Sequence, residues 1–287
     1  MMSKNLKHLF FPILMLLAPS AFSQDSHKSL LWEISGNGLS EPSYLYGTMH
    51  TADKRVFNFK RGVIEAFNNA QAFAMELDFE KSIKFNLIEK LIMDSGYTIQ
   101  SLLSEEEYAK VSAFFRDSLK QNVMMYNKMQ PMFLASMVSQ RNLKKDMGEP
   151  LDLYFNSLAK EQNKQIYGLE TMEEQINAFS SISYKEQAEA LLDAVENSEQ
   201  GKNEMEQMLE DYISGDLDKL LNMTKDKEMS EDFIEIFLTK RNRIMAERAE
   251  VIMKEKSVFI AVGAAHLAGE QGLISLFQNK GYRVWPR

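Results

Sequence analysis

The sequence predicts a mixed α/β fold, with one central sheet built from both ends of the chain and a large helical insert between them. Short apolar segments bounded by turn residues mark the strands, at 30–35, 44–47, 72–77, 164–170, 258–262 and 282–285. At 258–262, five apolar residues in a row are too many for a half-exposed strand and too few for a membrane span, which favours a strand inside an α/β sheet. Between the third and the fourth segment, apolar residues recur at helical spacing instead.

The front of the chain is predicted to form a hairpin. Residues 30–35 (LLWEIS) alternate enough for a first strand, and Gly36-Asn37-Gly38 is typical of a turn to a second strand at 44–47. Thr51-Ala52-Asp53 then offers a cap for a helix over about 61–69. The third strand, 72–77, carries Glu76 near its end.

The insert and the back of the chain show recognisable helix boundaries. Ser104 and Glu107 form a capping-box pair, and Pro131 and Pro150 suit the starts of helices over 132–143 and up to about 160. After the strand at 164–170 (KQIYGLE), helical patterns fill about 173–238, with a break at 214–216, and then 239–254. Strand 258–262, a helix over about 269–280 and strand 282–285 complete the chain.

Residues 1–23 are predicted to be a secretory signal peptide. Lys4 and Lys7 precede an apolar stretch at 9–19, and small residues at 20–23 provide a cleavage site. The apolar stretch is shorter than the roughly 20 residues that a membrane helix needs. We therefore expect a periplasmic or secreted protein whose mature part, residues 24–287, forms one domain without further membrane contact.

Composition excludes several classes of function. The chain has 0 cysteines, so thiol catalysis, cysteine-ligated metals and a lipid anchor at the end of the leader are ruled out. The net charge is −8, with 33 lysines and arginines against 41 acidic residues. Since no basic stripe with interleaved aromatics is present, nucleic acid is not an expected partner.

Histidine is scarce, and half of it stands in one repeated context. Of 4 histidines, His50 and His266 each end a Gly-x-x-His turn after an apolar strand. Open α/β sheets place their ligands at the carboxyl ends of strands. One such histidine would be read as a hydrogen-bonded structural side chain, but two in the same local context favour a functional site.

His50, His266 and Glu76 together supply the ligands of a catalytic metal. Catalytic sites use three protein ligands and keep a position for water. Imidazole and carboxylate without thiolate suit zinc, manganese, iron or cobalt. Glu76 could instead be an exposed acid at a strand end, but its apolar neighbours Phe73, Met75 and Leu77 favour a buried position.

Two further residues are candidate members of this site. Glu170 ends its strand after Gly168-Leu169 and could act as a fourth ligand or a general base. Arg241 could clamp a substrate carboxylate or stabilise an oxyanion, because its guanidinium is always charged. Alternatively, Arg241 belongs to a solvated helix face with Lys240 and Arg243.

Methionine is abundant, with 19 residues, several of which fall in the helical insert. Met124, Met125, Met129, Met132 and Met137 could form an adaptable groove for a peptide or another apolar substrate. They could equally fill the core of the insert.

These motifs resemble the TraB/GumN family, whose animal relatives are the Tiki metalloproteases. The resemblance rests on Tyr46-Gly47-Thr48-Met49-His50 and on Val262 to Gly269 with its second Gly-x-x-His. It extends through Ala74-Met75-Glu76, Tyr167 to Thr171 and Arg241-Asn242, in the family's order.

The resemblance implies a fold similar to the erythromycin-esterase and haem-binding ChaN group, with pseudo-symmetric halves. It also implies a metal-dependent hydrolase in which paired histidines and a glutamate are essential, with proteolysis supported by manganese or cobalt in the animal branch. These roles correspond to His50, Glu76 and His266, with Glu170 and Arg241 as further site members.

We therefore expect an exported hydrolase, namely a metallopeptidase that uses Mn, Co or Zn and acts on a peptide or protein substrate. The alternative is an envelope protein on the same scaffold that sequesters a peptide, haem or a metal without turnover.

Overall fold

The computed structural model describes residues 28–78, 87–141, 143–226 and 234–287. The predicted leader, residues 1–23, lies outside these residues. Within them, the strands form one sheet, and the predicted mixed α/β class is confirmed. The spatial order of the strands is β4 (Gln165–Glu170), β3 (Ala72–Leu77), β5 (Val258–Gly263), β2 (Ser43–Thr48), β1 (Leu31–Ser35) and β6 (Arg283–Pro286).

Four neighbouring strands of this sheet, β4, β3, β5 and β2, run parallel. Their register aligns the carboxyl ends, with Leu77 opposite Glu170 and Thr48 opposite Gly263. β1 pairs antiparallel with both β2 and β6, which confirms the predicted front hairpin. The carboxyl ends of the four parallel strands therefore meet at one edge of the sheet.

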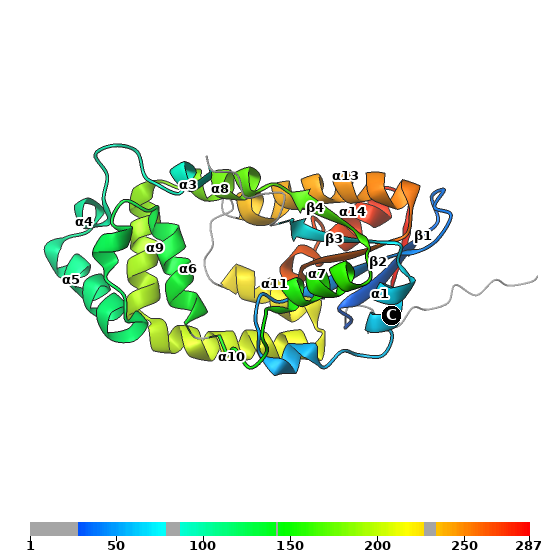
Figure 1. Ribbon diagram of the computed structural model, residues 1–287, viewed down its shortest axis with the longest axis horizontal. Coiled ribbons are helices and arrows are strands. Elements are labelled where there is room, and N and C mark those ends of the chain that lie inside the picture. Colours follow the sequence, from blue (N-terminus) through cyan, green and yellow to red (C-terminus); the bar gives the residue numbers. More distant parts are fainter. Residues whose placement is uncertain (1–27, 79–86, 142, 227–233) are drawn as a thin grey trace, which may run out of the picture.

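Helices cover both faces of the sheet (Figure 1). α13 (Lys240–Glu255) and α14 (Leu273–Asn279) pack on one face, and α1 (Val63–Asn69) and α7 (Leu151–Glu161) on the other. The central strands are buried, as their continuous apolar sequence predicts. Phe67 and Phe155 from the helices contact the ring of Phe259 on β5 at centroid distances of 5.3 Å each.

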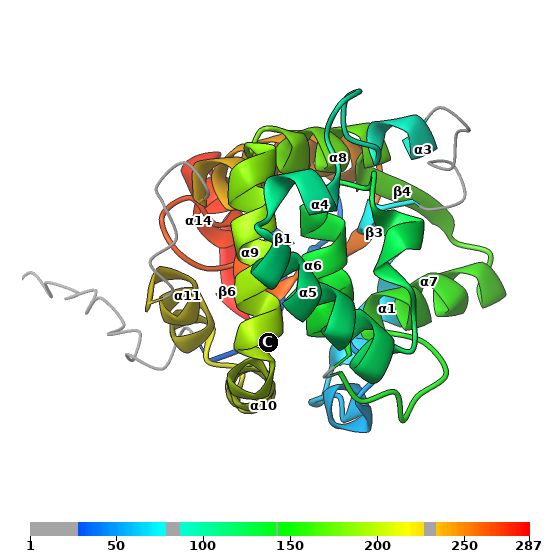
Figure 2. The same cartoon turned by 90° about the vertical axis from the view of Figure 1, so that its left-hand side faces the viewer.

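The helical insert has a hydrophobic core of its own. It is built mainly from α4 (Ile99–Leu102), α5 (Glu105–Phe114), α6 (Pro131–Gln140) and α9 (Tyr184–Glu196), which lie together in front of the sheet in Figure 2. The predicted capping box at Ser104 and Glu107 is confirmed, and Pro131 takes the first position of α6. The insert therefore packs largely on itself, apart from the sheet.

The remaining helices connect the insert to the sheet. α3 (Leu87–Lys90) contacts α8 (Met172–Ser180), and α10 (Ser198–Ser214) runs along the lower side in Figure 1 from the insert toward the sheet. Gly215, at a φ of 76°, separates α10 from α11 (Leu217–Asp226), as the predicted break requires. No helix in the described part of the chain is long and apolar enough to span a membrane.

Several element boundaries differ from the sequence prediction. Asp53 caps a short 3-10 helix, Lys54–Phe57, because its carboxylate accepts from the Arg55 backbone and side chain, and α1 starts only at Val63. The last long helix, α13, is preceded by a π-helical turn, Glu235–Thr239. α14 starts at Leu273 rather than near residue 269, since the backbone at Gly269 has a positive φ of 83° that a helix does not allow.

Candidate metal and catalytic site

The ends of the four parallel strands carry the site residues predicted from the sequence. His50 follows β2, Glu76 lies on β3, and Glu170 ends β4. His266 lies in a short 3-10 turn, Ala264–His266, directly after β5. β3, β5 and β2 are neighbours in the sheet. His50 and His266 therefore lie close to Glu76, although the three residues are far apart in the sequence.

The two histidines face one oxygen atom. Nε2 of His50 lies 3.9 Å from Oε1 of Glu76, and Nε2 of His266 lies 3.8 Å from the same Oε1. The structure therefore brings together the three residues that the sequence nominated as metal ligands. Their exposure differs: the His266 side chain is 6% exposed, whereas that of His50 is 61% exposed.

The opposite nitrogen of each ring is held by a buried acceptor. Nδ1 of His266 lies 2.6 Å from Oδ1 of Asn242 on α13, and the Asn242 amide nitrogen donates to the Gln271 carbonyl. Nδ1 of His50 lies 3.3 Å from Oδ2 of Asp152 on α7. In a neutral ring, an acceptor on Nδ1 holds the proton there and leaves Nε2 with the available lone pair, which is how metal-ligating histidines are oriented in proteins.

Glu76 is held as a buried carboxylate. The Gly263 N–H donates to Oε1 at 2.7 Å, and Nη2 of Arg241 donates to Oε2 at 2.8 Å. Burial disfavours the charged form, but the charges of His266, His50 and Arg241 and the Gly263 hydrogen bond outweigh it and lower the pKa of Glu76 to about 2. Glu76 is therefore ionised throughout the ordinary pH range.

Arg241 is engaged by two carboxylates. Its Nε and Nη2 donate to the two oxygens of Glu170 at 2.8 and 2.6 Å, in addition to the bond to Glu76, and its Nη1 donates to the Phe237 carbonyl at 3.3 Å. This bidentate geometry is the one that the guanidinium favours. Burial opposes the charge of Arg241, but its bonds and charge interactions with Glu170 and Glu76 raise its pKa. The solvated helix face considered from the sequence is not what the structure shows.

Glu170 contacts Arg241 rather than the histidines. Its side chain is fully buried, and Oε2 also accepts from the Gln175 amide at 3.2 Å. A role as fourth ligand or general base would require Glu170 to exchange its bonds with Arg241.

The pKa values of the two histidines shift in opposite directions. The hydrogen bond to Asp152 raises the pKa of His50, with a further contribution from the charge of Glu76 that acts against desolvation. Solvent at this largely exposed ring limits the size of that shift. Burial lowers the pKa of His266, although the charge of Glu76 acts against it. His266 is thus neutral at pH 7, the protonation state that binds a metal.

The donor atoms suit a divalent ion. Two imidazole nitrogens and one carboxylate oxygen form a set appropriate to a divalent transition metal. Bonds of about 2.1 Å keep two ligand atoms within about 4.2 Å of each other, and both histidine–glutamate separations meet that limit. Among the described residues, however, no group of three or more His, Cys, Asp or Glu is already arranged to hold an ion.

Gly263 leaves room at the centre of the site. A Cβ atom at this position would lie 3.2 Å from Oε1 of Glu76, 3.6 Å from Cδ2 of His266 and 3.9 Å from Nε2 of His50. The first distance is shorter than ordinary van der Waals contact. The absence of a side chain at Gly263 therefore keeps the space between the three candidate ligands open.

These residues lie at the wall of a cavity of about 550 Å³. The cavity lies between the carboxyl edge of the sheet and the helices α6, α10 and α11. Its size falls within the range of small-ligand pockets, roughly 300–1,000 Å³.

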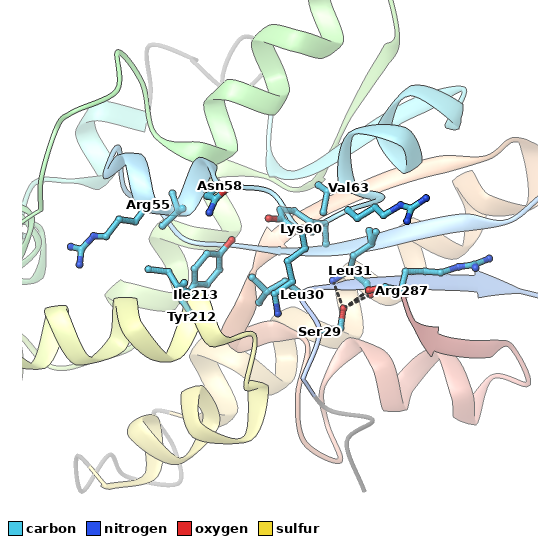
Figure 3. Close-up of a pocket in the computed structure, with 13 residues that line it drawn as sticks. Ser29, Leu30, Leu31, Arg55, Asn58, Lys60, Val63, Tyr212, Ile213 and Arg287 are labelled. Atoms are coloured by element: carbon cyan, nitrogen blue, oxygen red, sulfur yellow. Dashed lines mark hydrogen bonds between the residues drawn. The ribbon is translucent and has the colours of Figure 1, made fainter. Parts of the chain in front are cut away.

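A second cavity adjoins the first through Tyr212. Figure 3 shows it between α10, which contributes Tyr212 and Ile213, and the start of the first strand, where Ser29 bonds to Leu31 and Arg287. Its volume of about 40 Å³ is enough for water but not for a peptide. The hydroxyl of Tyr212 donates to the Gly47 carbonyl at 2.8 Å and so fixes the backbone that leads to His50.

The structure divides the five methionines named from the sequence. Met129, Met132 and Met137 pack against the core of the insert, whereas Met124 and Met125 are 56% and 79% exposed. Of the five, Met132 lines the large cavity, together with Met49, Met205 and Met208. The core-filling interpretation is thus confirmed for Met129, Met132 and Met137, whereas the groove for an apolar substrate stays a prediction. Most of the methionines at the cavity are not those that the sequence singled out.

Sequence reasoning missed the roles of Asp152 and Asn242. Asp152 lies in the first turn of α7, where an acid is ordinarily explained by the helix dipole. Asn242 follows Arg241, and only its buried position on α13 sets it apart. For both residues, only the folded structure reveals the role, because it shows a buried side-chain oxygen that faces Nδ1 of a histidine.

Comparison with known proteins gives one family and a set of distant relatives. A model described as the TraB/PrgY/gumN family matches residues 30–286. Metalloprotease TIKI2 of Danio rerio is 22% identical over 91% of this chain and 61% of that protein, and metalloprotease TIKI1 of the same species is 22% identical over 91% and 63%. The metalloprotease TIKI homolog of Amphimedon queenslandica is 23% identical over 95% and 65%.

The chain therefore spans less than two thirds of the length of these curated relatives. No solved structure matches the chain significantly.

Proposed function

The chain belongs to the TraB/PrgY/gumN family, and on that premise we propose that it is a metal-dependent peptidase whose divalent ion is held by His50, His266 and Glu76. The observation that carries the proposal is the approach of two Nε2 atoms, at 3.9 and 3.8 Å, to one oxygen of Glu76. Relatives named metalloproteases support the reaction class. The proposed metal is Mn, Co or Zn, and the proposed substrate is a peptide or protein.

A divalent ion in such a site supplies a water of lowered pKa and polarises the substrate carbonyl. The chain's own residues prepare the ligands. Asn242 and Asp152 orient the rings of His266 and His50, so neither ring has to be ordered when the metal ion binds. Arg241 keeps Glu76 ionised and fixed through the 2.8 Å bond to Oε2.

Arg241 and Glu170 act in this proposal mainly as supports. Nε and Nη2 of Arg241 are bonded to carboxylates. Stabilisation of an oxyanion by Arg241 would therefore use Nη1, which also donates to the Phe237 carbonyl at 3.3 Å. Glu170 neutralises Arg241 and holds it against Glu76. The predicted leader at residues 1–23 supports export, so the proposal includes a periplasmic or secreted location.

The test combines metal content with turnover. The protein is stripped with a chelator, Mn²⁺, Co²⁺ or Zn²⁺ is added back, and cleavage of a peptide library is followed by mass spectrometry beside elemental analysis. His50→Ala and His266→Ala should lose both the bound metal and the turnover. Glu65→Gln, an exposed carboxylate on α1, is the matched control and should keep both.

If both histidine variants retain metal and activity, the proposal is wrong. Stoichiometric binding of metal, peptide or haem without any product would instead support the sequestering protein considered as the alternative.

A further inference from the structure

The large cavity has two chemically different walls. The wall at the carboxyl edge of the sheet carries the polar residues of the proposed site, His50, Glu76 and His266, with Arg241 from α13. The wall from the helices carries Met132 on α6, Met205 and Met208 on α10, and Leu220 on α11. A molecule in the cavity would therefore touch the candidate ligands on one side and an apolar surface on the other.

The helical wall presents little polar surface in spite of its serines. The Ser136 hydroxyl donates to the Met132 carbonyl at 3.0 Å, and the Ser139 hydroxyl donates to the Ala135 carbonyl at 3.1 Å. These hydroxyl protons are used within α6. Gln140, at the exposed end of α6, is a further polar residue of this wall, whereas Met132 and Ala135 give the rest of α6 an apolar surface toward the cavity.

The methionines at this wall are not simply core residues. Met205 and Met208 on α10 are half-buried, and Met208 packs against the hydrophobic core of the sheet. A half-buried methionine beside a cavity is a deformable apolar surface, able to pack against side chains of different shape.

The charges at the cavity argue against recognition of a free carboxyl terminus. Arg241 is the one lysine or arginine among the described residues that line it. Its Nε and Nη2 atoms already bond to Glu170 and Glu76. A ligand is therefore selected by its apolar side chain more than by a terminal charge.

We propose that the cavity binds a peptide through a long apolar side chain, such as Leu, Met or Phe, which packs on Met132, Met205 and Met208 beside the bond presented to His50, Glu76 and His266. This inference rests on the proposed peptidase function and adds its substrate class. The volume of about 550 Å³ accommodates such a side chain and its flanking backbone. Because methionine adapts, the selection is for apolar character and not for one residue type.

The test uses hexapeptides in which one position at a time is fixed as Leu, Asp or Lys and the others are a fixed mixture of small residues. Cleavage by the full chain with Mn²⁺, Co²⁺ or Zn²⁺ is followed by mass spectrometry, and binding of the same labelled peptides by fluorescence anisotropy. At one position, Leu should exceed Asp and Lys by about tenfold or more in kcat/KM, the effect expected from burying one such side chain.

Met208→Lys and Met205→Lys should each remove most of this preference and improve the relative cleavage of the Asp peptides. Met125→Lys is the matched control, since Met125 is 79% exposed and does not line the cavity. It should behave like the wild type. Circular dichroism confirms that each variant is folded.

The outcomes separate the two proposals. Cleavage without an apolar preference, or a Met208→Lys variant indistinguishable from Met125→Lys, overturns the inference and leaves the peptidase function standing. Binding that prefers Leu and is lost in Met208→Lys, without cleavage under any metal, supports the inference and overturns the peptidase function. Neither binding nor cleavage overturns both.

Discussion

The Oδ1 atom of Asn242 lies 2.6 Å from Nδ1 of His266. The Asn242 amide nitrogen donates to the Gln271 carbonyl at 2.7 Å, so its oxygen is the atom that faces the ring. His266 must then donate through Nδ1, and its neutral ring directs a bare Nε2 toward Glu76. One amide thus decides which nitrogen of a buried histidine is available to an ion.

Asn242→Leu should weaken metal binding by about 10- to 100-fold, the usual effect of removing such an orienting partner. Asn242→Asp keeps an acceptor at the same place and should retain most of the affinity. Titration of the stripped protein with Co²⁺, followed by calorimetry and by the visible spectrum of the bound ion, measures both. Equal affinities in the two variants would contradict the role assigned to Asn242.

The two site histidines should titrate on opposite sides of their ordinary pKa of 6.5 in the metal-free protein. His50 should lose its proton above that value and His266 below it, because Asp152 supports the charge of one ring and burial opposes that of the other. NMR of the ring protons measures each pKa. Asp152→Asn should lower the pKa of His50 and leave that of His266 in place, whereas shifts of equal size in both would be inconsistent with this assignment.

The sheet and the three central site residues could be predicted because their signals are local. An apolar segment that ends in Gly-x-x-His identifies both the strand and the residue at its carboxyl end, and parallel strands bring such ends together. His50 and His266 follow from this rule, and Glu76 was predicted from its place near the end of a neighbouring apolar strand.

The supporting contacts could not be predicted because they join distant elements of the chain. Asp152 looks like any acid in the first turn of a helix, and the sequence alone left Arg241 either in the site or on a solvated helix face with Lys240 and Arg243. The structure separates them: Arg241 is 17% exposed against two buried carboxylates, while Arg243 on the same helix is 53% exposed. Which side of α13 faces the strand ends follows from packing and not from local pattern.

Glu76 should make the stability of the protein depend on pH in acid. Its folded pKa of about 2 lies below its ordinary value of 4.5, so the native state binds fewer protons in between. The ionised carboxylate therefore contributes about 3 kcal/mol to the free energy of unfolding. This contribution is complete above about pH 4.5 and is lost as the pH falls toward 2. Urea unfolding at pH 5 and pH 3 should show a smaller loss for Glu76→Gln than for the wild type, and an unchanged loss for Glu65→Gln.

Arg241→Met should destabilise the fold by about 3–5 kcal/mol, because it leaves Glu76 and Glu170 buried without their shared cation. Arg243→Met, at the exposed position two residues on, should change the free energy of unfolding by no more than about 0.5 kcal/mol. The double variant Arg241→Met, Glu170→Leu should recover part of the loss, since one of the two uncompensated charges is gone. Equal losses in the Arg241 and Arg243 single variants, measured by urea unfolding, would exclude the buried network as a source of stability.

The variant Gly263→Ala should change metal affinity without changing the stability of the fold. The backbone at Gly263 has φ −53° and ψ 135°, which alanine adopts without strain, so the change acts through the added methyl group alone. That methyl group would lie 3.2 Å from Oε1 of Glu76, and the carboxylate cannot easily give way because Arg241 holds its other oxygen. Metal affinity should therefore fall by about tenfold or more, while the Tm stays within a few degrees of the wild type.

Gly201→Ala provides the matched control for that prediction. Gly201 lies within α10, and a Cβ there would meet no atom within 4 Å. Alanine in a helix interior should raise stability by up to about 1 kcal/mol and leave metal affinity unchanged. A Gly263→Ala variant that binds Mn²⁺ or Co²⁺ as tightly as Gly201→Ala would show that the space beside Glu76, His50 and His266 is not where the ion is held.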